Sequence, residues 1–434
     1  MQTLKKRIIA SHIKIKTKMK VKNLLLAGLA VAAMTACSNE NDEIVDNGQV
    51  QGTENALIRL GISYPTVTRA TGDTEDGLTT EQLFKTAKVI VNGDVHTYAY
   101  DDFTPSTDPN EKGLYLKDGI PVSEGTANVY VILNLEGEPT APYANMTASA
   151  SYSTSLDGLT DYVAKDGEFL MSNAGGLVAT TNVEKGKEAT VRVNVERAAA
   201  KLMEQSKKDA FTNITPGTYN GKKLNITLKN YSFVNLQKDT YVLANATPIA
   251  SNFFQAYDPT NATWGYKTKE IVGNIQEETP TATENITYCL ENKDADNNTC
   301  VVYEAVATWD NETEPATFYV TSENVVYQDF ATLHEKFGNM LDASNLTADS
   351  KAADFRAAGV PIKMYEGGKC YYKADIYTNT TANKTIVRNN VYKLNVSSIT
   401  KLGDPTPTPT PDAASLMLEV KVLPWTINLV DIIL

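Results

Sequence analysis

The sequence has little of what an enzyme would need. Its 434 residues include only three histidines, which lie far apart at His12, His96 and His334. It contains no H-E-x-x-H zinc motif, no G-x-S-x-G nucleophile motif, no P-loop and no paired C-x-x-C. Acidic residues occur throughout, so no two of them stand out as a general acid and base. The sequence therefore predicts a protein that is not an enzyme, with no cofactor, metal or catalytic site.

The apolar run near the start, Leu24–Ala33, is too short to span a bilayer comfortably, which takes about 20 residues. It follows two lysines after Met19 and precedes Met-Thr-Ala and then Cys37, a pattern that resembles a bacterial lipobox. We expect residues 1–36 to be a lipoprotein signal peptide, with Cys37 lipidated and holding the precursor at the outer membrane. An ordinary secretory signal is the alternative. The sequence leaves open whether Met1 or Met19 is the start.

Positive charge is scarce beyond this segment. Residues 1–36 carry eight of the 40 Lys and Arg and no Asp or Glu, which leaves 32 basic against 52 acidic residues and a net charge of −20. Such a surface repels phosphate backbones, so nucleic acid is excluded as a partner. The stretch after Cys37, "SNENDEIVDNG", is a polar, acidic tether that resembles an export signal of surface lipoproteins.

Cysteine is rare as well, with only four in the chain. Cys289 and Cys300 flank an acidic turn, and in an oxidising compartment a disulfide between them would close a hairpin. Two unpaired thiols are the alternative, which the sequence alone does not exclude. Cys370 would have no partner.

What the sequence has in abundance is strand pattern. Alternating runs such as "AKVIVNGDVHTYAY" and "TCVVYEAVATW" recur with Gly, Asn, Asp and Pro between them. Helical signal is confined to short pieces at 80–87, 327–341 and 350–359. This predicts an all-β protein with two tandem β-sandwich domains, residues 70–205 and 206–403, and a few short helices. The "RAAAK" stretch at 197–201 is interpreted as a turn from strand to linker, with a recognition patch as the less favoured alternative.

Each end of the chain has a strand with the same period of two. Within residues 37–69, after the tether, the alternating side chains are Ala56, Ile58, Leu60, Ile62 and Tyr64. At the other end, the strand predicted in residues 413–434 alternates at Leu416, Leu418, Val420 and Val422, and the apolar face continues at Trp425 and Ile427. A Pro/Thr spacer, residues 404–412, connects the second domain to this C-terminal strand, and its sequence favours polyproline II.

Two interpretations of this C-terminal strand remain open. It either fills a groove in a neighbouring molecule, vacated when the N-terminal strand is removed, or it folds back onto its own second domain. An exposed strand this apolar would be an aggregation hazard, so it must pair somewhere. Arg69, between Thr68 and Ala70, is where a trypsin-like protease would cut to release the N-terminal strand.

These features together resemble the fimbrillin family of Bacteroidales, the major subunits of the type V pilus. The resemblance rests on the lipobox Cys37, Arg69 in "TVTRAT", "VNVERAAAKL", "VRNNVYKLNVSSITKLGDP" and the terminal "VKVLPW". It implies two transthyretin-like sandwiches, export as a lipoprotein, and cleavage between Arg69 and Ala70 by an arginine-specific surface protease. The Cys289/Cys300 pair is a departure from the family pattern.

The resemblance also implies polymerisation by donor-strand exchange. The displaced strand would be Ile58, Leu60, Ile62 and Tyr64, and the donor strand would include Leu416, Leu418, Val420, Val422, Trp425 and Ile427. Partners would be identical subunits, joined head to tail in a fimbrium on the cell surface, with tip and anchor subunits. Having both a removable N-terminal strand and a C-terminal extension is typical of a stalk subunit. The competing hypotheses are a surface glycan-binding lipoprotein of a polysaccharide-uptake system, which would need exposed aromatic residues, and a fimbrial tip adhesin.

Overall fold

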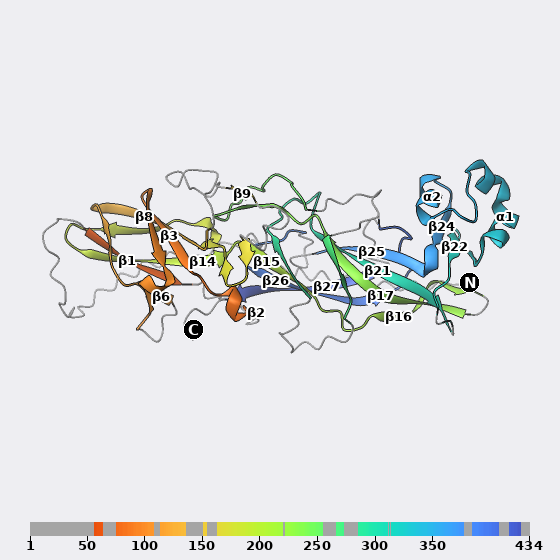
Figure 1. Cartoon of the computed structure of the whole chain (residues 1–434), viewed down its shortest axis with the longest axis horizontal. Coiled ribbons are helices and arrows are strands. Elements are labelled where there is room, and N and C mark those ends of the chain that lie inside the picture. The colour runs from red at the N-terminus through yellow and green to blue at the C-terminus, as the bar shows by residue number, and fades with distance from the viewer. Residues whose placement is uncertain are drawn as a thin grey trace, which may run out of the picture. The chain divides into compact units, whose positions relative to one another are not determined.

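The structure, a computed structural model, describes most of the chain after residue 55. The described residues are 56–63, 75–107, 113–135, 151–153, 163–219, 222–254, 266–272, 285–310, 312, 314–376, 384–407 and 416–426. Almost all of their regular structure is strand (Figure 1). The predicted all-β class with a few short helices is confirmed.

One large sheet contains ten strands in the order β4-β3-β8-β12-β14-β1-β6-β5, with β13 alongside β8 and β7 alongside β1. Its strands are β1 (Ala56–Ser63), β3 (Thr86–Val91), β4 (Asp94–Ala99), β5 (Phe103–Pro105), β6 (Gly113–Leu116), β7 (Ile120–Val122), β8 (Gly125–Leu133), β12 (Met171–Asn173), β13 (Ala179–Val183) and β14 (Glu188–Arg197). The strand nearest the N-terminus thus lies inside the sheet and not at its edge.

Two five-stranded sheets are built from later parts of the chain. One has the order β2-β27-β26-β15-β20, namely Glu75–Asp76, Leu416–Thr426, Asn390–Ile399, Ala199–Glu204 and Ile286–Leu290. The other consists of β16 (Ala210–Tyr219), β17 (Lys222–Val234), β21 (Cys300–Trp309), β25 (Lys369–Asp375) and β19 (Tyr266–Glu270), the last pairing with β17. The first of them pairs β2, from the early part of the chain, with β27 at the end of the described residues.

The remaining elements are short. Two strand pairs are β10 (Ala164–Lys165) with β11 (Glu168–Phe169) and β9 (Ser151–Ser153) with β18 (Asp239–Tyr241), and a small sheet joins β22 (Phe318–Thr321), β23 (Val326–Tyr327) and β24 (Ile362–Tyr365). The α-helices are α1 (Phe330–Ala343) and α2 (Ala352–Ala357), and single 3₁₀ turns lie at Thr79–Glu81, Tyr100–Asp102, Ala174–Gly176 and Glu366–Gly368. Among the described residues, no helix is both long and apolar enough to cross a membrane.

Two of the three predicted helical pieces are confirmed. Asp329 begins α1 by accepting a hydrogen bond from the Thr332 backbone N–H at 2.8 Å, and α2 lies within the piece predicted at 350–359. The third prediction, at 80–87, is wrong: a single 3₁₀ turn is followed by β3. Pairing of β3 with both β4 and β8 overrides the local helical preference.

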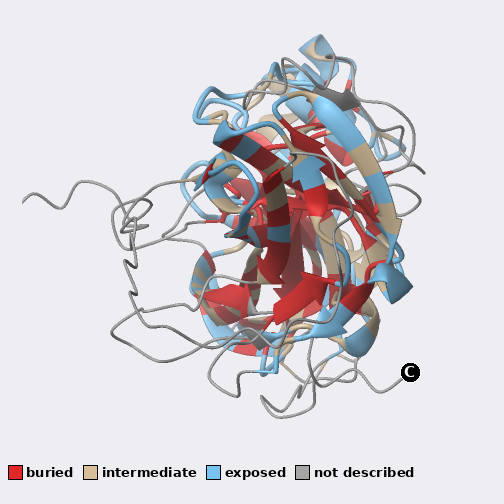
Figure 2. Cartoon of the chain, turned by 90° about the vertical axis from the view of Figure 1, so that its left-hand side faces the viewer, coloured by how far each residue is buried: buried red, intermediate tan, exposed pale blue. Residues whose placement is uncertain are grey.

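The strands enclose two large hydrophobic clusters, whose residues form the buried interior of Figure 2. Strand β15 contributes to both, because its side chains alternate: Ala199 and Met203 belong to the first cluster, Ala200 and Leu202 to the second. The predicted domain boundary at residues 205 and 206 lies just after this strand and stays a prediction.

Cys289, Cys300 and Cys370 are free thiols, all 0% exposed. The considered bridge between Cys289 and Cys300 is not formed, which corrects that hypothesis in favour of its alternative. Cys289 lies on β20, which pairs with β15, whereas Cys300 opens β21 and pairs with Val234 and Asp375 in another sheet. Burial raises the pKa of each thiol, to about 12 for Cys300 and Cys370, so they are unreactive near neutral pH.

Candidate functional site

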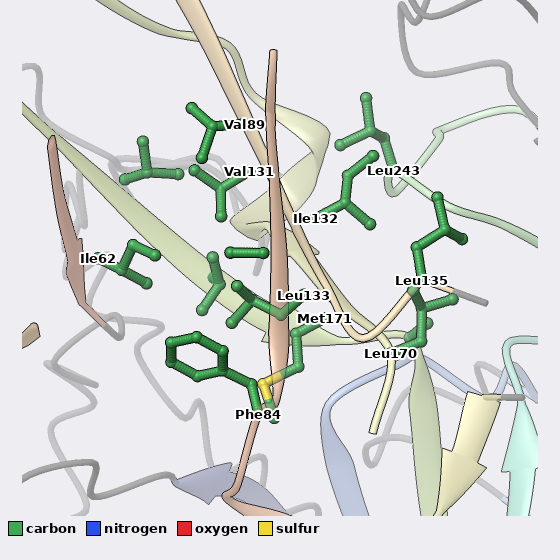
Figure 3. Packing of buried hydrophobic residues seen from close by; sticks show 14 of the residues in the cluster. Ile62, Phe84, Val89, Val131, Ile132, Leu133, Leu135, Leu170, Met171 and Leu243 are labelled. Atoms are coloured by element: carbon green, nitrogen blue, oxygen red, sulfur yellow. The ribbon is translucent and has the colours of Figure 1, made fainter. Parts of the chain in front are cut away.

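Strand β1 fills an internal position of its sheet, which we call the β1 slot. It pairs in parallel with β14 along Leu57 to Ser63, while its other edge pairs antiparallel with β7 and β6. Ala56, Ile58, Leu60 and Ile62 point into the first cluster and are 0–1% exposed. Figure 3 shows Ile62 facing the cluster that contains Phe84. Removing β1 would therefore expose two strand edges and a row of apolar side chains.

The outer face of β1 is covered by an aromatic ring. Tyr115 of β6 lies so close over Gly61 that a Cβ there would be 2.8 Å from its Cε1 atom. The Arg59 guanidinium lies 5.0 Å from the centre of the same ring, and Arg192 Nε donates a hydrogen bond to the Tyr115 hydroxyl at 2.8 Å. Ser63 Oγ donates to Asn194 Oδ1 at 2.7 Å. The slot thus has an apolar inner face and a polar outer face.

The C-terminal strand β27 is held differently. It pairs antiparallel with β26 from Leu416 to Pro424, and on its other side only Trp425 and Thr426 pair, with β2. Leu416 is buried, but Leu418, Val420 and Val422 are only partly buried where they pack on the second cluster. Among the described residues, this strand therefore folds back onto its own chain. That is the second of the two arrangements that the sequence leaves open.

Trp425 ends this strand in a pocket of aromatic and charged side chains. Its indole is 1% exposed, stacks on Tyr288 with ring centres 6.0 Å apart, and meets the edge of Phe169 at 5.7 Å. The Arg197 guanidinium lies 4.1 Å from the ring centre, and its Nη1 donates to the Trp425 carbonyl at 3.1 Å. The sequence leaves two roles open for Trp425, an anchor of the donor strand, which is favoured, or a core residue. Here its ring is part of the first cluster, whereas Leu416 belongs to the second.

A buried ion pair lies beneath that indole. The Glu81 carboxylate, 0% exposed, accepts from Lys201 Nζ at 2.7 Å, from the Tyr288 hydroxyl at 2.5 Å and from Trp425 Nε1 at 3.2 Å. Burial and then the Glu81 charge raise the pKa of Tyr288, which keeps its hydroxyl a donor. Arg197 Nε donates to the Glu81 carbonyl at 2.9 Å. These contacts satisfy charges that would be costly to bury alone.

The sequence did not identify this pocket. Arg197 and Lys201 lie in the "RAAAK" stretch, interpreted as a turn, yet it carries the end of β14 and part of β15. Glu81 lies in the piece wrongly predicted as helix. One signal could have pointed to them: Arg197 and Lys201 flank three alanines, and an unpaired charge beside so apolar a stretch would be expensive if it were buried.

A second buried carboxyl lies beside the strand that supports β27. Glu204 of β15 is 0% exposed, and its Oε1 accepts from the Ser206 backbone N–H at 3.1 Å and from the Ser206 hydroxyl. That hydroxyl oxygen in turn accepts from the Val396 backbone N–H of β26 at 3.0 Å. Burial raises the pKa of Glu204 from 4.5 to about 7.

Several predicted site residues lie outside the described residues. These are the lipidation site Cys37, the cleavage pair Arg69 and Ala70, and the strand residues Tyr64 and Ile427. Of the spacer, residues 404–407 are described. Asp404 pairs with Tyr371 through two backbone hydrogen bonds of 2.7 and 3.0 Å and with Lys363 at 2.7 Å. The start of the spacer is thus attached to β25.

Comparison with known proteins gives one family match and several matches among solved structures. Residues 363–431 match the model for "Major fimbrial subunit protein type IV, Fimbrillin, C-terminal", a span that begins in β24 and includes β27. None of the curated proteins is similar in sequence.

Among solved structures, a candidate cell adhesion protein from Parabacteroides distasonis shares 12% identity over 86% of this chain and 99% of its own, with a TM-score of 0.49. The fimbrilin of Porphyromonas gingivalis W83 shares 16% identity over 86% of this chain and 99% of its own, with a TM-score of 0.45. The tip fimbrial protein Mfa3 of Porphyromonas gingivalis shares 10% sequence identity over 86% of this chain and 100% of its own, with a TM-score of 0.41. Likeness at this level does not by itself assign a function.

Proposed function

We propose that this chain, whose residues 363–431 match the fimbrillin C-terminal model, is a stalk subunit of a cell-surface fimbrium that polymerises by donor-strand exchange. The precursor is exported as a lipoprotein on Cys37 and cleaved after Arg69 by an arginine-specific protease. Strand β1 then leaves, and the C-terminal strand of another copy takes its place. The observation that carries the proposal is that β1 and β27 have the same alternating apolar pattern, yet β1 is paired along both edges and β27 is fully paired along only one.

The acceptor side follows from the β1 slot. Ile58, Leu60 and Ile62 are 0% exposed, and burying such side chains contributes about 1.5–3 kcal/mol each, a gross 5–9 kcal/mol for the three. A cleaved subunit that has lost β1 must leave this surface open or fill it from outside. Strand addition also satisfies the backbone groups of β14, β6 and β7.

The donor side follows from the position of β27. Apart from its two-residue contact with β2, it pairs along one edge only among the described residues, and its side chains at Leu418, Val420 and Val422 are only partly buried in its own chain. In the β1 slot, the same side chains would be buried on the inner face, and the backbone of the strand would form hydrogen bonds along both edges. The donor strand therefore gains burial of these side chains and backbone hydrogen bonds, and its alternating pattern already fits the slot.

Such a contact joins unlike surfaces of two copies, so it does not close on itself and extends into a filament. Lipid anchoring before cleavage keeps the precursor at the outer membrane, and the acidic exported chain resists non-specific association. The glycan-binding alternative needs exposed aromatics. The two described tryptophans, Trp309 and Trp425, are 3% and 1% exposed and offer no such platform.

The test uses a change of protease specificity at the cleavage site. The Arg69→Lys precursor should resist an arginine-specific protease and form no fibres, while a lysine-specific protease should restore cleavage, a new N-terminus at Ala70 and heat-resistant ladders on a gel. Wild-type precursor with each protease is the matched control. Fibres from uncleaved Arg69→Lys protein would overturn the mechanism. In a second arm, an excess of a peptide with the sequence of residues 56–64 should block growth of the cleaved wild type.

A further inference from the structure

We propose that the incoming strand enters the β1 slot in a single register, with Leu416, Leu418 and Val420 in the places of Ile58, Leu60 and Ile62. In this register, Glu419 takes the place of Gly61 and lies beside Arg192 of the accepting copy. The inference rests on the proposed function and adds which residues of the two copies meet.

The direction of the strand and the alternation of its side chains limit the possible registers first. Strand β1 runs parallel to β14, so a replacement must keep that direction. The pairing of β26 and β27 has its one irregularity between Val396 and Ser398 of β26, so β27 alternates without interruption from Leu416 to Val422. Side chains of a strand alternate between faces, so only shifts by an even number of residues keep the apolar side inward.

Side-chain size decides between the even shifts. Moving the donor by two residues in one direction places Leu416 at Ala56, whose methyl group is packed in the first cluster at 1% exposure. Forcing three extra carbons into such a site strains the core. Moving it by two in the other direction places an alanine of the sequence at Ile58, which leaves a void where a buried side chain was. In the proposed register, Leu416 replaces Ile58, Leu418 replaces Leu60 and Val420 replaces Ile62, so each buried side chain is replaced by one of similar size.

Proline excludes a larger shift. Moving the donor by four residues in the first direction would place Pro424 at Ile62, within the span of β1 that pairs with β14 and β6. Proline has no backbone N–H, so a ladder hydrogen bond would be lost there. In the proposed register, Pro424 lies three positions beyond Ser63, past the end of the ladder.

Charge on the outer face supports the same choice. Gly61 pairs with Arg192 of β14 on one side and with Tyr115 of β6 on the other. The proposed register places Glu419 there, next to a guanidinium, whereas the shift by two residues places Lys421 there, next to a like charge. The three atoms nearest a Cβ at this position all belong to the ring of Tyr115, so that side chain must turn aside, and the carboxylate can then accept from Arg192.

The test is a cross-link between copies in assembled fibres. Residues directly opposite on neighbouring strands have Cα atoms within the 4.4–6.8 Å range that a disulfide needs, whereas diagonal neighbours lie about 7–8 Å apart. The double variant Arg192→Cys/Glu419→Cys should give an oxidised intermolecular ladder. Arg192→Cys/Lys421→Cys and Arg192→Cys/Met417→Cys, which report the neighbouring registers, should not. All four residues are exposed in the uncleaved chain, so folding is preserved, and the native thiols of the described residues are buried.

A ladder from the Lys421 or Met417 pair, or fibres without any ladder, would overturn the register. Absence of fibres from cleaved wild-type protein would overturn the proposed function instead. A charge exchange checks the contact independently. Arg192→Glu should slow growth by about two- to five-fold, as loss of an exposed ion pair does, and Arg192→Glu/Glu419→Arg should recover it. No recovery would contradict the contact.

Discussion

Strands β1 and β27 carry the same alternating apolar pattern but occupy unlike positions. β1 has partners along both edges and inner side chains that are 0–1% exposed. β27 has one full partner, a two-residue contact with β2, and inner side chains that are mostly half-buried. The alternating pattern alone therefore does not determine how strongly a strand is held. The position of the strand in its sheet determines it, and the four predictions below test this difference between β1 and β27.

The largest effect is expected at the end of β27. Trp425→Ala removes an indole that contacts Tyr288, Phe169 and Arg197 and leaves Glu81 without one of its donors. The free energy of unfolding of the uncleaved chain should fall by about 3–5 kcal/mol, measured by urea denaturation. Trp425→Phe, which keeps an aromatic ring, is the control and should lose less. A loss below 1 kcal/mol for the alanine variant would mean that this end does not hold the strand.

Next is a matched pair of leucines, one from each strand. Leu60→Ala removes a fully buried side chain and should destabilise the uncleaved chain by about 2–5 kcal/mol. Leu418→Ala, on the half-buried strand, should cost less than half as much, because part of its surface is already in water. Equal losses in urea denaturation would contradict the difference in burial on which the proposed donor-strand exchange depends.

The third prediction concerns pH and the support of β27. The folded-state pKa of Glu204 is raised from 4.5 to about 7, so the stability it contributes is fully present below pH 4.5 and is lost as pH rises through 7. Relative to Glu204→Gln, the wild-type free energy of unfolding should fall by about 3 kcal/mol between pH 4.5 and 8. Denaturation of both proteins at each pH measures it, and parallel profiles would exclude a buried, neutral Glu204.

The smallest effect is expected on the outer face of β27. Met417 is 56% exposed, so Met417→Ser should change the free energy of unfolding by no more than about 0.5 kcal/mol. The control is Ile58→Ser on the inner face of β1, which should be severely destabilising because it buries a hydroxyl in an apolar cluster. If both variants unfolded at the same denaturant concentration, the assignment of inner and outer faces would be wrong.

What the sequence predicted correctly depended on local patterns. Alternation at Ile58, Leu60 and Ile62 places them on one face. The run "AKVIVNGDVHTYAY", predicted as one strand-like stretch, forms two strands, β3 and β4, joined by Asn92 and Gly93 at positive φ. These features need only neighbouring residues, so a single sequence carries them.

What it missed depends on distant residues. Glu81 contacts Lys201, Tyr288 and Trp425, which are 120 to 344 positions away in the chain. No periodicity encodes such a meeting, and each residue alone reads as an ordinary surface or core residue. The helix predicted at 80–87 failed for a related reason, because its last two residues, Thr86 and Ala87, pair with β4, and Ala87 also pairs with β8.

The pairing of β1 on both edges has a mechanical consequence. A strand that replaces it would lie between β14 on one side and β6 and β7 on the other, with hydrogen bonds directed across its length. Tension along the strand loads these bonds together in shear, and no single bond can open first at a free edge. In a fibre assembled as proposed, resistance to pulling would then be set by the whole ladder of each joint.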